Sequence, residues 1–239
     1  MGDSLLVMSP CYGGNCSVMY AKSLVALTAR CIKENISLGY ETMSNASLIP
    51  DARNKLTRNF MATDFTHMLF IDSDIEFDPE HVVAMFRSGK RIVGGTYPQK
   101  AILWDRVEEA VKKGIPTDQL KYYATRLTFN PFKEAKAING FVPVQDISTG
   151  LLMIQRDVIT KMYQAYPETL TIPEQEGHRP TFGIFDCFND GTRALSEDFA
   201  FCRRAQKIGE TVYCYMPAVC KHAGTYVFEG TLATSVEQY

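Results

Sequence analysis

The sequence has no apolar run that approaches the ~20 residues needed to span a membrane as a helix, so any membrane contact is expected to be peripheral. Its first residues lack the charged and apolar regions of a signal peptide. Seven cysteines are an odd number, and they form neither a C-x-x-C pair nor a zinc-binding spacing. These absences predict a protein of the reducing cytoplasm.

An excess of charge of either sign is also missing, because the formal net charge is only -2 over 239 residues. The sequence therefore predicts no global basic field for nucleic acid or an anionic membrane, although local patches are not excluded. No G-x-G-x-x-G fingerprint follows the first predicted strand, which argues against a dinucleotide-binding unit. With 46% hydrophobic residues, the chain can form one substantial α/β core.

The most informative stretch is an apolar run that ends in two acids. Met68–Ile71 predicts a buried parallel strand, and Asp72 and Asp74 follow it directly. Residues i and i+2 of an extended chain project to the same side, so both carboxylates can converge at the edge where α/β sheets bind ligands. Paired carboxylates favour a hard cation such as Mg2+ or Mn2+. A plain turn is the alternative, since Asp and Ser also favour loop starts.

The rest of the chain alternates between apolar strand patterns and amphipathic helix patterns, which predicts an α/β sheet flanked by helices. Further strands are expected at Leu5–Met8, Ser37–Ser44, Arg91–Thr96, Val142–Ile147, Leu151–Ile154 and Thr211–Met216. Helices are expected at Cys16–Glu34, from Ile49 onward, and at Pro79–Ser88, Arg156–Tyr166 and Ser196–Ile208. Pro167–Gly191 is predicted as a long loop, and long loops in compact domains are often functional.

Residues 101–136 interrupt this alternation and are expected to form an inserted flap rather than sheet. Amphipathic helices are predicted near Trp104–Lys113 and Thr117–Thr125. The flap mixes basic and aromatic side chains, namely Lys121, Tyr122, Tyr123, Arg126 and Phe129. This mixture suits stacking on a sugar or on single-stranded nucleic acid, and ordinary packing is the alternative.

Two polar residues lie near the start of the helix predicted to begin at Ile49, just before the acidic strand. Arg53 and Asn54 can there reach an anionic ligand at the edge of the sheet, and a solvated charged face is the alternative. Pro10 and Tyr12 follow the first strand, where two glycines allow a close turn around a ligand and Tyr12 offers an aromatic face. A plain turn explains the glycines equally well.

Two further candidates lie late in the chain. Asp198 stands in the first turn of a helix that Ser196 can cap, where the helix dipole alone also accounts for acidic residues. His222 is the last histidine of the sequence. A lone histidine is usually a packed or surface residue, so its role depends on which residues the fold places next to it.

Four motifs occur in a characteristic order: Pro10-Cys11-Tyr12, Asp51-Ala52-Arg53-Asn54, Phe70-Ile71-Asp72-Ser73-Asp74 and Ser196-Glu197-Asp198. The chain thereby resembles GT-A fold glycosyltransferases, most closely the family 2-like ones, over roughly residues 4–100 and 145–225. The resemblance implies a Rossmann-like, mixed but mainly parallel sheet within a single catalytic domain over 1–239. Residues 1–100 would bind the nucleotide sugar, and 137–239 would form the acceptor side.

The resemblance also implies roles for single residues. Asp72 would contact the ribose or the metal, and Asp74 would ligate Mn2+ or Mg2+ at the diphosphate. His222 would complete the metal shell, and Asp198 would be the catalytic base of an inverting enzyme. The remaining matches are Arg53 and Asn54 at the nucleotide or its phosphates, Pro10 and Tyr12 beside the base, and Ser148-Thr149-Gly150 at the sugar and acceptor pocket. The first turn reads Tyr-Gly-Gly-Asn rather than the family's Tyr-Asn, which leaves the choice of base open.

The expected function is therefore a metal-dependent hexosyl- or pentosyltransferase that uses a nucleoside-diphosphate sugar, with a UDP-sugar favoured, and a hydroxyl acceptor. A glycan is the favoured acceptor, while a lipid-linked sugar, a protein or a modified DNA base stays open. One alternative is a non-catalytic nucleotide- or glycan-binding module of the same fold. Another is a metal-dependent nucleotidyltransferase, although the Gly-rich phosphate loop with Arg or Lys after the first strand is missing.

Overall fold

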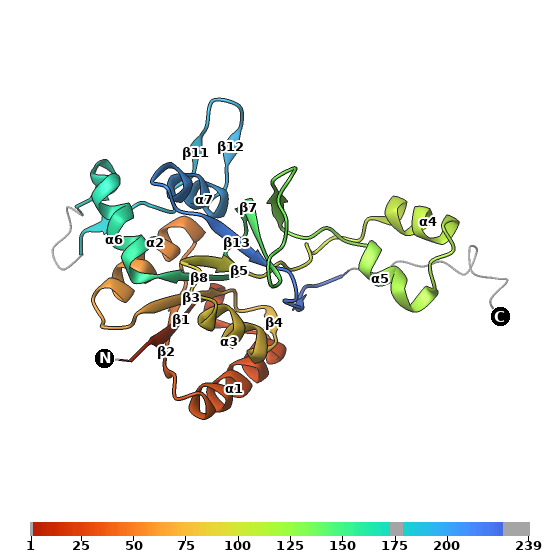
Figure 1. Ribbon diagram of the computed structural model, residues 1–239, viewed down its shortest axis with the longest axis horizontal. Helices are drawn as coiled ribbons and strands as arrows, with labels where there is room; N and C mark the ends of the chain where they lie inside the picture. Colours follow the sequence, from red (N-terminus) through yellow and green to blue (C-terminus); the bar gives the residue numbers. More distant parts are fainter. Residues whose placement is uncertain (1, 173–178, 227–239) are drawn as a thin grey trace.

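The computed structural model describes residues 2–172 and 179–226. Its centre is an eight-stranded sheet with the order β2-β1-β3-β8-β5-β13-β7-β6 (Figure 1). The strands are β1 Ser4–Cys11, β2 Ser37–Ser44, β3 His67–Ile71, β5 Ile92–Gly94, β6 Phe129–Pro131, β7 Phe141–Ile147, β8 Leu151–Gln155 and β13 Val212–Tyr215. The strands predicted from the sequence are thus confirmed, and β6 is added at the edge.

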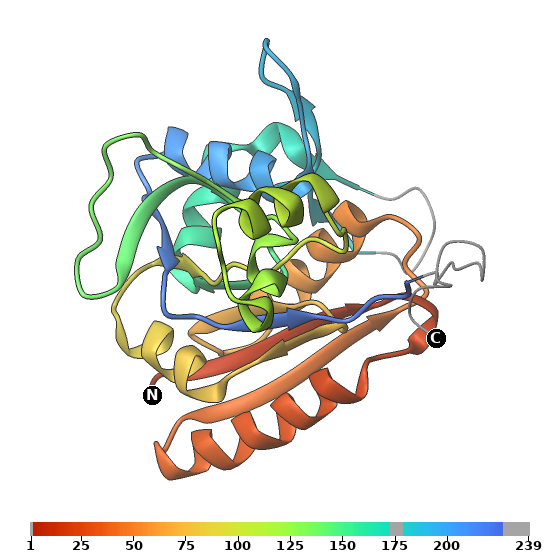
Figure 2. The same ribbon diagram turned by 90° about the vertical axis from the view of Figure 1, so that its right-hand side faces the viewer.

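Helices cover both faces of this sheet, as Figures 1 and 2 show. On one face lie α1 (Val18–Lys33) and α3 (Pro79–Arg87), whose buried side chains share a core cluster with those of the sheet. On the other face lie α2 (Ile49–Met61), α6 (Arg156–Ala165) and α7 (Glu197–Lys207), which form a second cluster. The architecture is the mixed α/β sheet flanked by helices that the sequence predicts.

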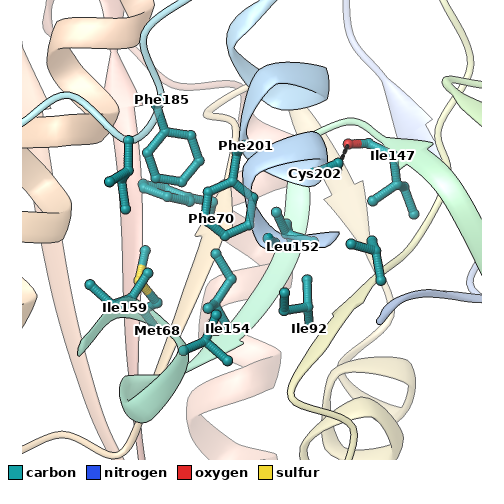
Figure 3. Close-up of a cluster of buried hydrophobic side chains, with 14 of the residues drawn as sticks. Met68, Phe70, Ile92, Ile147, Leu152, Ile154, Ile159, Phe185, Phe201 and Cys202 are labelled. Carbon is teal, nitrogen blue, oxygen red and sulfur yellow. Dashed lines mark hydrogen bonds between the residues drawn. The ribbon is translucent and has the colours of Figure 1, made fainter. Parts of the chain in front are cut away.

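β3 is buried on both sides, which explains why its sequence is apolar throughout rather than alternating. Met68 and Phe70 point into the cluster under α2, α6 and α7, while Leu69 and Ile71 point into the cluster under α1 and α3. In the first cluster, the ring of Phe185 contacts the rings of Phe70 and Phe201, which Figure 3 draws next to one another. Its ring centroid is 5.4 Å from that of Phe70 and 4.6 Å from that of Phe201.

The direction of β8 decides which loop meets the end of β3. β3 is parallel to β1, as expected, but β8 runs antiparallel between β3 and β5. The first residue of β8, Leu151, therefore pairs with the last residue of β3, Ile71. This pairing places the segment 148–150 beside the two acids that follow β3, and the N–H of Asp72 donates to the carbonyl oxygen of Gly150 at 3.2 Å.

A small two-stranded sheet joins the acidic turn, which is the segment Asp72–Asp74, to the last strand of the described chain. β4 (Ile75–Phe77) pairs antiparallel with β14 (Cys220–His222), so that His222 lies opposite Ile75. The sequence analysis did not predict either strand. A three-residue strand is too short to show a periodic pattern, and its pairing depends on a partner far away in the sequence.

Short elements also occupy part of the segment predicted as a long loop, Pro167–Gly191. They are the pair β9 (Leu170–Thr171) and β10 (Thr181–Phe182), and the strand β11 (Phe188–Asn189). β11 forms a hairpin with β12 (Ala194–Leu195), which follows the segment, and this hairpin projects from the body (Figure 2). Residues 173–178 of this predicted loop lie outside the described residues.

The flap contains α4 (Trp104–Lys112), a 3-10 turn at Thr117–Gln119 and α5 (Leu120–Tyr123), which lie apart from the sheet in Figure 1. Within the predicted flap, β6 pairs with β7 at the sheet edge, so Phe129–Pro131 belong to the sheet, and the boundary at residue 136 stays a prediction. The division into a donor half and an acceptor half stays a prediction. Across residues 2–172 and 179–226, no helix has the length and apolar character to cross a membrane.

Candidate active site

The site begins where β1 and β3 end side by side. These strands are parallel, and Met8 pairs with Phe70, so Pro10 and Asp72 follow at the same edge of the sheet. Tyr12 lies just beyond, with 77% of its surface exposed. The N–H of Ser17, at the start of α1, donates to the carbonyl oxygen of Ser73 at 2.8 Å and fixes the acidic turn against this first loop.

Arg53, on α2, contacts acidic residues from two different elements of the site. Its Nη2 donates to Oδ1 of Asp72 at 2.9 Å, and its Nε lies 3.5 Å from Oε1 of Glu197 on α7. The side chain is almost completely buried, with its guanidinium carbon 5.1 Å from the centre of the Phe70 ring. Burial alone would lower the pKa of Arg53, but the carboxylates of Asp72 and Glu197 raise it above its ordinary value, so the group stays charged.

One nitrogen of this buried guanidinium has no partner. Nη1 of Arg53 has no hydrogen-bond acceptor among the described residues, and it is shielded from solvent. An unsatisfied buried donor is costly, and such donors in native structures call for an explanation such as a bound ligand. The prediction that Arg53 holds part of an anionic ligand is compatible with this vacant donor.

Asp74 has other partners than Asp72 does. Its Oδ2 is paired with the ammonium group of Lys100, and its Oδ1 lies 3.3 Å from Nε2 of His222. Burial acts to raise the pKa of Asp74, but the hydrogen bonds from His222 and Lys100 outweigh it and lower the pKa to about 2. The carboxylate is therefore ionised at neutral pH and available to a cation.

The ring of His222 is oriented by the backbone. Its Nδ1 lies 2.8 Å from the carbonyl oxygen of Pro98, which can only accept, so Nδ1 carries a hydrogen and donates it there, while Nε2 faces Oδ1 of Asp74. A backbone carbonyl on the second ring nitrogen is the usual support of a metal-bound histidine. A ring bound to a cation would use Nε2, the nitrogen that faces Asp74, so the two side chains can share one ion.

The third predicted metal ligand is placed differently. Asp72 directs Oδ1 to Arg53, and within the part of the chain that the structure describes no group of three or more His, Cys, Asp or Glu side chains is placed to hold a metal ion. The residues thus fit a cation held by Asp74 and His222, with its remaining ligands supplied from elsewhere. Oxygen ligands from a diphosphate would match the preference of Mg2+.

Both polar atoms of the Asn54 amide form hydrogen bonds to other residues of the protein. Its Oδ1 accepts from the N–H of Phe185 at 2.9 Å, and its Nδ2 donates to Oδ1 of Asp186 at 2.7 Å. These contacts hold Phe185 in its place against Phe70 and Phe201. The structure therefore gives Asn54 a supporting role, and the prediction that it binds the nucleotide stays untested.

Asp198 lies in the first turn of α7, partly exposed. Its Oδ1 accepts from the hydroxyl of Ser196 and from the N–H of Phe199, while Oδ2 has no partner among the described residues. The sequence predicts that the side chain of Ser196 caps α7, and this is wrong, since that side chain makes no capping hydrogen bond. Glu197, beside it, faces Arg53, and burial raises the pKa of its carboxyl despite that cation.

Two residues of the site escaped the sequence analysis. Tyr97 is buried, its hydroxyl accepts from the N–H of Gly150 at 3.2 Å, and its ring meets that of His222 edge-on with centroids 5.3 Å apart. Burial, and then the charge of Asp72, raise the pKa of Tyr97 above its ordinary value. Lys100 is the other, paired with Asp74. The one signal for both was their position directly after the predicted strand 91–96.

No family model and no curated protein sequence matches the chain. Among solved structures, A197 from STIV is similar with a TM-score of 0.52 and 16% identity, over 93% of this chain and 86% of that one. GalNAc-T7 with UDP, GalNAc and Mn2+ is similar with a TM-score of 0.51 and 8% identity, over 92% of this chain and 43% of that one. Likeness at these identities concerns the fold alone, and that fold is the mixed, mainly parallel sheet of GT-A glycosyltransferases.

Proposed function

We propose that this protein is a metal-dependent glycosyltransferase that moves a sugar from a nucleoside-diphosphate sugar, with UDP favoured, to a hydroxyl of a glycan acceptor. The observation that carries the proposal is the convergence of Asp74 and His222 at the carboxyl edge of β3, with the histidine ring fixed by Pro98. The GT-A fold supports it, and the GalNAc-T7 structure, which contains UDP, GalNAc and Mn2+, supports this choice of donor and metal.

Asp74 and His222 would hold the Mn2+ or Mg2+ ion. The ion, when bound, neutralises the charge that develops on the departing diphosphate. Lys100 already lies against Asp74 and adds a second positive charge at this place, so it would contact the same diphosphate. Asp72 would reach the ribose or the ion through its second oxygen, because Arg53 holds only Oδ1.

The buried arginine and the first loop would orient the nucleotide. Nη1 of Arg53 is the donor without a partner, and a phosphate or ribose oxygen would satisfy it. Tyr12, exposed at the end of β1, would border the base together with Pro10. Pro10 and Tyr12 lie at the same edge of the sheet as Asp72, because the register of β1 and β3 brings the ends of the two strands together.

Asp198 would act as the general base. Its Oδ1 is held by Ser196 and Phe199, so the carboxylate is oriented, and Oδ2 remains to accept a proton. The acceptor hydroxyl oxygen would form a bond to the anomeric carbon as the bond from that carbon to the diphosphate oxygen breaks. The hydroxyl proton goes to Asp198, and attack from the face opposite the leaving group inverts the anomeric centre.

The test is a panel of nucleotide sugars, screened for thermal stabilisation and for slow hydrolysis with Mn2+ and with EDTA. We expect one donor, a UDP-sugar first, to raise the melting temperature and to be hydrolysed only in the presence of the metal. Stabilisation without hydrolysis or transfer to any glycan would favour a binding module of the same fold. Release of pyrophosphate from a nucleoside triphosphate would favour nucleotidyl transfer instead.

A further inference from the structure

A separate, open cavity of about 540 Å3 lies on the flap, and Arg106, Tyr122, Arg126 and Leu127 in its lining are exposed to solvent. Its size is within the roughly 300–1,000 Å3 that is usual for pockets binding small ligands. The residues that line it are two arginines, two aromatic residues, a threonine and a leucine, namely Arg106, Arg126, Tyr122, Phe129, Thr125 and Leu127. This lining contains no carboxylate.

The positive charge of this cavity is not neutralised by the flap's own acids. Arg106 of α4 donates from Nη1 to the carbonyl oxygen of Thr125 at 2.7 Å, which fixes its direction without cancelling its charge. The guanidinium of Arg126 has no hydrogen bond or ion pair among the described residues, while its carbonyl oxygen accepts from the N–H of Gln99 at 2.8 Å. Glu108 is engaged by Lys112 on α4.

The cavity borders the candidate active site through shared backbone. Leu127 forms an antiparallel bridge with Pro98, whose carbonyl oxygen orients His222. Thr128 donates from its hydroxyl to the carbonyl oxygen of Tyr97 at 3.2 Å. Phe129 pairs with Ile147, next to the segment 148–150 that faces Asp72. The segment that lines the cavity is therefore joined directly to the segments that carry Tyr97, Pro98 and Ile147.

We propose that this cavity binds the anionic part of the acceptor, a saccharide that carries a carboxylate or a phosphate group. Guanidinium groups bind both anions through paired hydrogen bonds. Tyr122 is 72% exposed and offers a ring on which a sugar can stack. The role as acceptor site rests on the proposed glycosyltransferase function, whereas binding of the saccharide does not.

A nucleic acid fits this cavity less well. Binding to nucleic acids relies on a series of phosphate contacts along a basic groove or stripe. The cavity presents two guanidinium groups within one pocket, and the formal net charge of the chain is -2. The chemistry of the lining therefore favours one charged sugar over a continuous polyanion.

The protein carries its own reporter for the test. Trp104 is the one tryptophan of the sequence, it is 62% exposed, and it lies two residues before Arg106 on α4. Its fluorescence should change on titration with a galacturonic acid oligomer or with a hexose monophosphate, without metal or donor present. A neutral galactose oligomer should bind at least about tenfold more weakly, since loss of a charge-assisted hydrogen bond has an effect of that order.

Three variants locate the binding. Arg126→Ala and Arg106→Ala should each weaken binding of the acidic oligomer by about tenfold or more. Lys112→Ala removes one positive charge from the same helix outside the cavity and should leave the affinity unchanged. Circular dichroism melting of all three variants shows whether the flap remains folded, and binding is compared only among variants that melt as the wild type does.

Comparison of the anions then identifies the group that is recognised. Tighter binding of the oligomer assigns a carboxylate, and tighter binding of the monophosphate assigns a phosphate. Equal affinity for acidic and neutral sugars, or equal loss in Lys112→Ala, would overturn the proposal. So would a single-stranded DNA oligonucleotide that binds more tightly than either sugar and depends on Arg126.

The donor panel with Mn2+ is independent of this titration. If the donor panel fails and the acidic saccharide binds, the proposed enzyme function is lost and the saccharide site stands. If the donor panel succeeds and no acidic saccharide binds at millimolar concentration, the site is refuted and the enzyme stands.

Discussion

The guanidinium of Arg53 contacts Asp72 at 2.9 Å and reaches Glu197 at 3.5 Å, so one buried cation separates two carboxylates that lie 125 positions apart in the sequence (197 − 72). Asp72 belongs to the end of β3 and Glu197 to the start of α7. Asp72 and Glu197, the neighbour of the candidate base Asp198, therefore share one support.

Replacement of Arg53 should destabilise the fold. Arg53→Met leaves two partly buried carboxylates without their cation, and breaking a buried ion pair by removing one partner costs about 3–5 kcal/mol. The free energy of unfolding from urea titration measures this loss. Lys55→Met, which removes an exposed i,i+4 pair on the same helix, should change it by no more than about 0.5 kcal/mol.

The loss of stability in Arg53→Met should depend on pH, and the pKa of Glu197 determines the sign of this dependence. The pKa of Glu197 is raised by burial in the folded protein, so its ionised form is disfavoured there, and more strongly once Arg53 is absent. A raised folded pKa gives stability that is present at low pH and lost as the pH rises through that pKa. The difference in free energy of unfolding between the wild type and Arg53→Met should therefore become smaller as the pH falls. A difference that becomes larger would contradict the role of Arg53 as the cation that stabilises ionised Glu197.

Asp74→Ala should abolish the Mn2+-dependent stabilisation by UDP while the protein still folds, because the side chain lies beyond the end of β3 and outside both core clusters. Calorimetric titration of UDP with Mn2+, repeated with EDTA, measures the effect. An affinity for UDP that is the same with and without the chelator would show that the metal has been assigned wrongly.

His222→Ala should weaken Mn2+ binding, because it removes the ring nitrogen that faces Asp74. His81→Ala is the matched control, since His81 contacts the N–H of Val219 and the ring of Tyr215 and has no contact with Asp74. Metal titration followed by isothermal calorimetry should separate the two variants. A His222 variant that loses melting temperature but binds the metal like the wild type would identify a packing residue.

Asp198→Asn keeps the shape of the side chain and removes its basicity, so turnover should fall by ~100-fold or more while donor affinity stays nearly constant. Asp157→Asn, on α6 and paired with Arg91, should leave turnover unchanged. Nuclear magnetic resonance of the first-formed product should show an anomeric configuration opposite to that of the donor. Retained configuration would refute Asp198 as the base.

Much of the fold could be predicted because its information is local. The apolar run of β3 and the acids after it reflect burial on both faces and a strand end at a ligand-binding edge. The α/β alternation likewise follows from short windows of sequence. The antiparallel direction of β8 could not be predicted, since it depends on which strand end lies beside which.

The site was less accessible to sequence reasoning, because its contacts span long distances along the chain. Nothing near Lys100 indicates that it meets Asp74, and nothing near Glu197 indicates Arg53. Asn54 shows the opposite case. Its motif suggested a ligand, whereas its amide supports Phe185 and Asp186. Motifs identify the residue types at a site, and only the tertiary structure shows which of them already have partners.

The position of β8 has a consequence for how the chain reaches its folded state. β3 and β5 are close in sequence, but β8 lies between them and pairs with both. A nascent chain that has emerged only to residue 100 therefore carries two strand edges that no partner can yet cover, and such edges promote association between chains. We expect a fragment of residues 1–100 to aggregate, and the edge that bears Asp72 and Asp74 to form only once Leu151–Gln155 has been synthesised.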